Sequence, residues 1–113
     1  MIKVDAIYPE NMDRRKAYKM TSSTSMFRMR DLDGVFTPVA AVFFTDERED
    51  GTSTNILSLE MDDGSVYATN SSTFIRAFGD ILSYFGDIQQ VGTLQVIHSS
   101  SKSGRPYIIC EIV

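Results

Sequence analysis

The sequence has few of the residues from which catalytic and metal sites are built. Its 113 residues include one cysteine, Cys110, and one histidine, His98. A single cysteine excludes a disulfide within the chain and fits a reducing compartment, and a single histidine excludes a histidine-based metal cluster within one chain. The phosphate-binding patterns GxxxxGK[ST] and GxGxxG are also absent. We therefore expect a protein that is not an enzyme and holds no metal or cofactor, with Cys110 as a small buried hydrophobe.

Long apolar runs are missing as well. No segment approaches the roughly 20 apolar residues that cross a membrane, and the first residues, MIKVDAIYPENMDRRK, lack the apolar region of a signal peptide. We therefore expect a cytosolic protein with no membrane partner. The length, with 42% hydrophobic and 23% charged residues, is ordinary for one packed domain over residues 1–113.

Positive charge is in short supply overall but is concentrated in one part of the chain. The net charge is −4, from 11 basic and 15 acidic residues, which argues against a protein that coats polyanions indiscriminately. Acidic residues gather in 45–50 and 60–64. Six basic residues fall within 14–30: Arg14, Arg15, Lys16, Lys19, Arg28 and Arg30. This segregation predicts a basic groove on an acidic body, and the alternative is a strand with ordinary solvated side chains.

Alternating β-type residues predict strands on both sides of one helix. We expect an irregular arm over 1–13, a long first strand over 16–32, and further strands over 37–45, 54–61, 65–69, 92–99 and 107–113. Neighbours in a strand point to opposite faces. Arginines 28 and 30 must face water, which would turn Phe27 and Met29 inward. By the same rule one of Phe43 and Phe44 must face out, and the sequence does not say which.

The stretch TNSSTFIRAFGDILSYFG, residues 69–86, predicts a helix. Asn70, Ser71 or Ser72 can cap its start, and Gly86 supplies the stop. Gly79 costs about 1 kcal/mol in a helix interior relative to alanine, which suggests a close approach by another element. Large residues at helical spacing form one apolar face that binds the core: Phe74, Ile75, Phe78, Ile81, Leu82 and Phe85.

A helix between the third and fourth strands is the order of the five-stranded OB-fold. Closing a small sheet into a barrel removes its exposed edges, and an apolar helix can cover the open end. We therefore predict a mainly β, five-stranded OB-fold-like barrel. The alternative is an α+β domain with the helix lying across one face of an open sheet.

Cationic and aromatic side chains occur together at several places, as in proteins that hold single strands. Tyr18 lies between Lys16 and Lys19, and Tyr67 is predicted to face outward from 65–69. The stretch SSSKSGRPY offers two cations on a flexible hairpin, with an aromatic residue at its base, although an ordinary solvated hairpin would look the same. In 107–113 the alternation turns Ile108, Cys110 and Ile112 inward.

Two segments, DGSVYATNSSTFIRAFGDILSYFG and LQVIHSSSKSGRPYIICEIV, carry a resemblance to a known family. They resemble small single-stranded-DNA-binding proteins encoded by bacteriophages and mobile elements of Gram-positive bacteria, over roughly residues 55–113. The resemblance implies an OB-fold, sequence-tolerant binding of single-stranded DNA, protection of replication or recombination intermediates, and contact with replication or recombination proteins. It points to Tyr67, Lys102, Arg105 and Tyr107 as site residues.

The predicted nucleic-acid-binding residues fall into two chemical groups. Phosphates would lie along Arg14, Lys16, Lys19, Arg28, Arg30, Lys102 and Arg105, and bases would stack on Tyr18, Tyr67 and Tyr107. The alternative function is a small phage-type interaction module that binds a host protein through the acidic segment 45–64, imitating nucleic-acid charge. In either case, exposed strand surface at 108–113 could pair with another copy of the chain.

Overall fold

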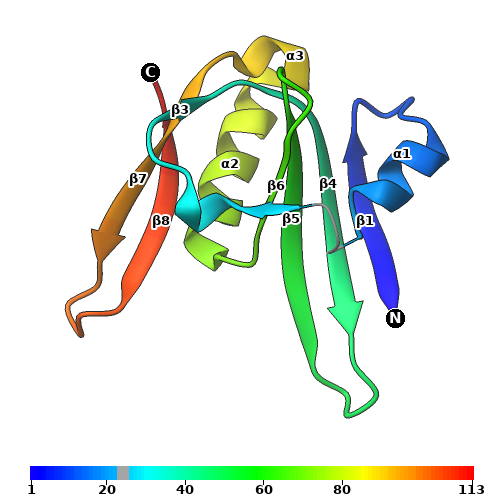
Figure 1. The fold of residues 1–113 in the computed structure, drawn as a ribbon, viewed down its shortest axis with the longest axis horizontal. Helices are drawn as coiled ribbons and strands as arrows, with labels where there is room; N and C mark the ends of the chain where they lie inside the picture. Colours follow the sequence, from blue (N-terminus) through cyan, green and yellow to red (C-terminus); the bar gives the residue numbers. More distant parts are fainter. Residues whose placement is uncertain (23–25) are drawn as a thin grey trace.

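Residues 1–22 and 26–113, which the computed structural model describes, form a mainly β protein with two sheets (Figure 1). One sheet has five strands in the order β1-β4-β5-β6-β2, and the other has three in the order β3-β7-β8. The elements along the chain are β1 (Ile2–Tyr8), α1 (Arg14–Lys19), β2 (Phe27–Arg28), the 3-10 turn η1 (Met29–Asp31), β3 (Val35–Phe36), β4 (Pro38–Glu47), β5 (Ser53–Met61), β6 (Val66–Thr69), α2 (Ser72–Phe85), α3 (Ile88–Val91), β7 (Leu94–Ser100) and β8 (Pro106–Ile112).

The two sheets meet along one nearly continuous stretch of chain. β3 pairs with β7, and after Thr37 the chain enters β4, which pairs with β5 and β1. Within the described residues no ladder joins β6 to β8, so the strands do not close into the predicted barrel. The hydroxyl of Thr73, in the first turn of α2, donates instead to the carbonyl of Ile108 on β8 at 2.7 Å. Helix α2 therefore lies between the sheets and packs mainly against β8 (Figure 1).

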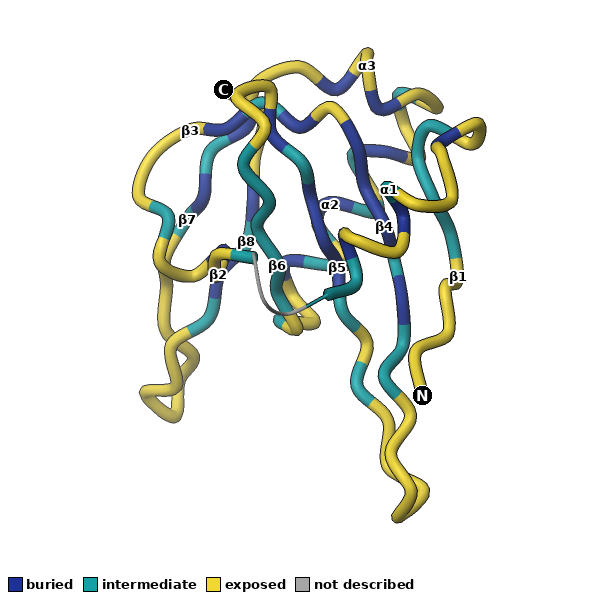
Figure 2. The backbone as a smooth tube through the Cα atoms, turned by 45° about the vertical axis from the view of Figure 1, so that its right-hand side comes forward, coloured by how far each residue is buried: buried dark blue, intermediate teal, exposed yellow. Residues whose placement is uncertain are grey.

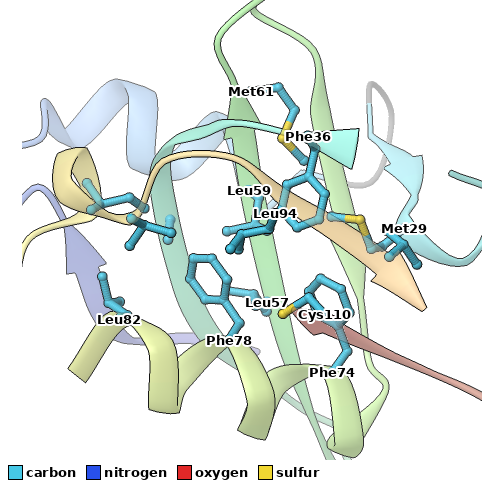
Figure 3. Close-up of a cluster of buried hydrophobic side chains, with 14 of the residues drawn as sticks. Met29, Phe36, Leu57, Leu59, Met61, Phe74, Phe78, Leu82, Leu94 and Cys110 are labelled. Carbon is cyan, nitrogen blue, oxygen red and sulfur yellow. The ribbon is translucent and has the colours of Figure 1, made fainter. Parts of the chain in front are cut away.

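Residues 27–33 cross the opening that the sheets leave. At one end β2 pairs with β6, and at the other the carbonyl of Leu32 lies 3.0 Å from Nε2 of His98 on β7. Between these ends Met29 is fully buried among residues of both sheets and α2 (Figure 3). The segment thus fills the opening with a core side chain instead of a strand ladder.

Helix α2 forms where the sequence predicts it. The hydroxyl of Ser71 caps its start by accepting from the amide of Phe74 at 3.3 Å, and Gly86 ends it with a φ of 77°. Phe74, Phe78 and Leu82 are buried in the main core (Figure 3). The prediction of a close approach at Gly79 is wrong, because a Cβ there would meet nothing within 4 Å.

Both faces of β4 are covered, each by a different helix. Ala40, Val42 and Phe44 belong to a small second core with Met12, Ala17 and Met20 of the α1 region. Phe43, which lies between Val42 and Phe44 on β4, packs against the main core on the α2 side. The expectation that one of the two phenylalanines faces water is therefore wrong. Phe44 is only 2% exposed, and Phe43 is half-buried.

The N-terminal third differs most from the prediction. The expected arm contains β1, whose apolar Ile2 and Val4 alternate with Lys3 and Asp5 and which pairs with β4. The expected first strand over 16–32 contains instead the end of α1, the two-residue β2 and η1, and its residues 23–25 lie outside the described part. Asp13 starts α1 by accepting from the amide of Arg15, and Ala17 is buried. A short helix with one cap and few buried residues leaves a weak periodic signal.

Burial follows this architecture along the chain. The middle of the molecule is buried, while the turns of the β4–β5 and β7–β8 hairpins are exposed and project at the same end (Figure 2). Across the described residues, no helix combines the length and apolar character needed to cross a membrane.

Candidate nucleic-acid interface

An open hollow of about 570 Å³ lies on the α1 side of the five-stranded sheet. We call it the arginine hollow, and its lining is Ile2, Thr21, Met26, Arg28, Arg30, Phe44, Asp46, Ile56, Ala68, Thr69 and Asn70. Four of its apolar members come from strands β1, β4, β5 and β6, and the fifth, Met26, precedes β2. The volume falls within the range of ligand pockets, about 300–1,000 Å³.

Two predicted phosphate contacts, Arg28 and Arg30, come together at this hollow. Arg28 is aligned with Ala68 by the parallel β2–β6 pairing, and Arg30 follows two residues later on η1. Both side chains are exposed, and neither has an ion pair within residues 1–22 and 26–113. Asp46 is the only carboxylate in the lining, so the described lining carries an excess of one positive charge.

Phe27, which precedes Arg28 on β2, forms an aromatic pair with Tyr67. Phe27 is 60% exposed, and its ring centroid is 5.4 Å from that of Tyr67, with the planes inclined at 37°. The prediction that Phe27 turns inward with Met29 is wrong because the extended backbone lasts only through β2. The 3-10 turn that follows changes the alternation, so Met29 alone enters the core. Tyr67 was predicted to face outward, but it is half-buried against the main core.

Helix α1 carries four of the predicted site residues in different settings. Arg14, Tyr18 and Lys19 are exposed, Tyr18 to 75%. The ammonium of Lys16 lies 2.7 Å from a carboxylate oxygen of Glu60, so it links α1 to β5. Thr21, one residue past the C-cap of α1, lines the arginine hollow. The C-terminal end of α1 therefore borders the hollow.

The remaining predicted residues lie on the β7–β8 hairpin. Lys102 and Arg105 are exposed in its turn, and Tyr107 is half-buried at its base. Figures 1 and 2 place this turn and α1 on opposite sides of the molecule, so the ten predicted residues do not form one surface. On β8 the inward prediction holds for Ile108 and Cys110, both 4% exposed, but is wrong for Ile112, which is 55% exposed because the sheet ends there.

A second hollow of about 410 Å³ adjoins the first. We call it the helix hollow, and its lining is Ser53, Thr54, Asn55, Asn70, Ser72, Ile75 and Arg76. Asn70 belongs to both hollows. The sequence identified Asn70 only as a possible helix cap and gave Arg76 no site role. The available signal was that Arg76 is the single basic residue of α2.

The thiol of Cys110 is buried in the core, and the carboxylates of Asp50 and Asp63 form hydrogen bonds within turns. Burial, with a smaller contribution from the charge of Glu111, raises the pKa of the Cys110 thiol to about 12. Hydrogen bonds from Thr52 lower the pKa of Asp50, and those from Ser65 lower that of Asp63, because both carboxylates accept bonds within turns. No group of three or more histidine, cysteine, aspartate or glutamate side chains in the described chain could hold a metal ion.

Comparison with protein-family models, with curated proteins and with solved structures gives no match to this chain.

Proposed function

We propose that this chain binds single-stranded DNA without reading its sequence and protects replication or recombination intermediates. The arginine hollow carries the proposal: two arginines that form no ion pair within the described residues stand over an apolar floor. The exposed Phe27, which precedes Arg28 on β2, lies outside the lining of the hollow and supplies a ring at its border. Proteins that hold single strands combine cations along the phosphates with rings that stack on bases, which tolerates any sequence.

The proposal includes an OB-like arrangement of the strands. If β3 and β4 count as one bent strand, the path β6-β5-β4/β3-β7-β8 contains five strands, with α2 between the third and fourth in chain order. In OB-folds, oligonucleotides bind on the face of the second and third strands, between the first hairpin loop and the last. The corresponding face here is that of β5 and β6, which supply Ile56 and Ala68 to the arginine hollow.

A fluorescence titration with poly-dT at two salt concentrations tests the proposal. We expect binding that weakens as salt rises, because bound phosphates release counterions. Arg28→Glu with Arg30→Glu should weaken binding and reduce the log–log salt slope by about 2, one for each lost phosphate contact. Lys3→Glu with Arg15→Glu is the matched control, since both side chains are exposed and line neither hollow. Absence of wild-type binding at low salt would overturn the proposal.

The alternative, a protein-interaction module with an acidic contact surface, receives less support. The acids of 45–64 gather at the two ends of β5, near Asp50 and near Asp63. At about 3.3 Å per residue these ends are roughly 25 Å apart. Asp50 and Asp63 each accept hydrogen bonds within their own turns, and Glu60 pairs with Lys16. Hydrogen bonds within turns and one ion pair therefore explain why several of these acidic residues occur where they do.

A further inference from the structure

The arginine hollow and the helix hollow meet round the free end of β6. Thr69, the last residue of β6, pairs with Leu57, so β5 continues past β6 through Asn55 to Ser53. Asn70 is exposed at this point and lines both hollows. The two hollows are therefore adjacent parts of the surface, with Asn70 at their boundary.

The two hollows lie toward opposite faces of the five-stranded sheet. The arginine hollow contains Phe44 and Ile56, which belong to the α1 side. The helix hollow contains Ile75 and Arg76 from the first turns of α2, which covers the other side. A ligand that occupies both must bend round the end of β6.

The lining of the helix hollow suits a sugar–phosphate backbone. It contains Arg76, two asparagine amides and three hydroxyl groups, and no described lining residue is acidic. Such side chains make most protein contacts to phosphate and sugar and carry no sequence information. Arg76 is exposed and, within the residues that the structure describes, has no ion pair.

We propose that a single strand bound in the arginine hollow continues past Asn70 into the helix hollow, where Arg76 contacts a phosphate. This inference rests on the proposed function and adds to it a bent path and two residues, Asn70 and Arg76. A strand long enough to fill both hollows gains the Arg76 contact, and a strand that fills only the arginine hollow does not.

Oligothymidylates of two lengths test the path, at about 4 and about 16 nucleotides, the limits of the usual site size per OB-fold. Arg76→Glu should weaken binding of the long strand by about tenfold, the value of one charge-assisted hydrogen bond, and leave the short strand unchanged. Arg76→Lys should restore most of the long-strand affinity. Lys3→Glu is the control for a charge reversal on an exposed side chain outside both hollows.

The outcomes separate this inference from the proposed function. If Arg76→Glu weakens both lengths equally, or weakens neither, while Arg28→Glu with Arg30→Glu still weakens binding, the bent path is wrong and the function stands. If the wild-type chain binds neither length at low salt, both proposals fall.

Discussion

Gly79 occupies a helical position that alanine would also fit. It lies inside α2, and a Cβ at this residue would meet no atom within 4 Å. Glycine in a helix interior is about 1 kcal/mol less favourable than alanine, because the unfolded chain has more conformational freedom to lose. Gly79→Ala should therefore raise the free energy of unfolding by up to about 1 kcal/mol, measured by urea denaturation.

Gly86 is the matched control for that substitution. It also has open space around it, but its φ of 77° lies in the left-handed region that side chains with a Cβ disfavour. Gly86→Ala should lower the free energy of unfolding by about 1–2 kcal/mol. If both substitutions change stability in the same direction, helix conformation is not the cause of either effect.

Cys110 should be unreactive in the folded protein. With a pKa of about 12, its thiol is almost entirely protonated at pH 8, and only the thiolate attacks thiol reagents. We expect negligible labelling by a disulfide reagent at pH 8 in buffer and full labelling in denaturant. Rapid labelling of the native protein would contradict the burial of this side chain.

The same pKa predicts a decrease in stability at alkaline pH. The folded state keeps the thiol proton up to about pH 12, while the unfolded chain loses it near 9.0. The unfolded state therefore binds fewer protons between these values, so the free energy of unfolding falls as pH rises from about 9 to 12. Below pH 9 the group has no effect. Cys110→Ala should show a shallower fall in urea titrations over this range.

At the scale of elements, the sequence predicted correctly those helices and strands that bury several large side chains in the core. Strands β4, β5, β7 and β8 and helix α2 each bury large residues at regular spacing, so their periodicity was readable. β1 is an edge strand of the five-stranded sheet, α1 has six residues of which Ala17 is buried, and β2 lasts two residues. In the site, the exposure of Arg28 and Arg30 was readable from their charge. The meeting of hollows at Asn70 depends on where β6 ends against β5, which no local pattern encodes.

The segment over residues 27–33 is expected to contribute to stability despite its irregular structure. Met29 on η1 is fully buried in the main core, across the opening between the sheets. Met29→Ala should lower the free energy of unfolding by about 2–5 kcal/mol, whereas Met29→Leu, which conserves volume, should cost less than about 1.5 kcal/mol. Urea denaturation measures both. A small effect of the alanine substitution would show that the segment packs loosely.

At the scale of the whole molecule, the cations predicted to contact phosphates lie in three places: the arginine hollow, helix α1 and the β7–β8 turn. The arginine hollow has Arg28 and Arg30, and the β7–β8 turn has Lys102 and Arg105. A net charge of −4 gives no general attraction for a polyanion, so binding must depend on these local groups. Neither Lys102 nor Arg105 lines the arginine hollow, so a short strand held in the hollow need not reach the turn.

Reversing the hairpin charges therefore measures how far the bound strand extends. Lys102→Glu with Arg105→Glu should reduce the affinity for poly-dT and lower the log–log salt slope by about 2 if both contact phosphates. The effect should shrink as the strand is shortened. Reversal of Arg28 and Arg30 should act at every length, because the proposed function places even a short strand in the arginine hollow. Titrations over a series of oligothymidylates measure both dependences. If the hairpin variant binds poly-dT as the wild type does, the β7–β8 turn is an ordinary solvated hairpin, and the interface is confined to the hollows round β6.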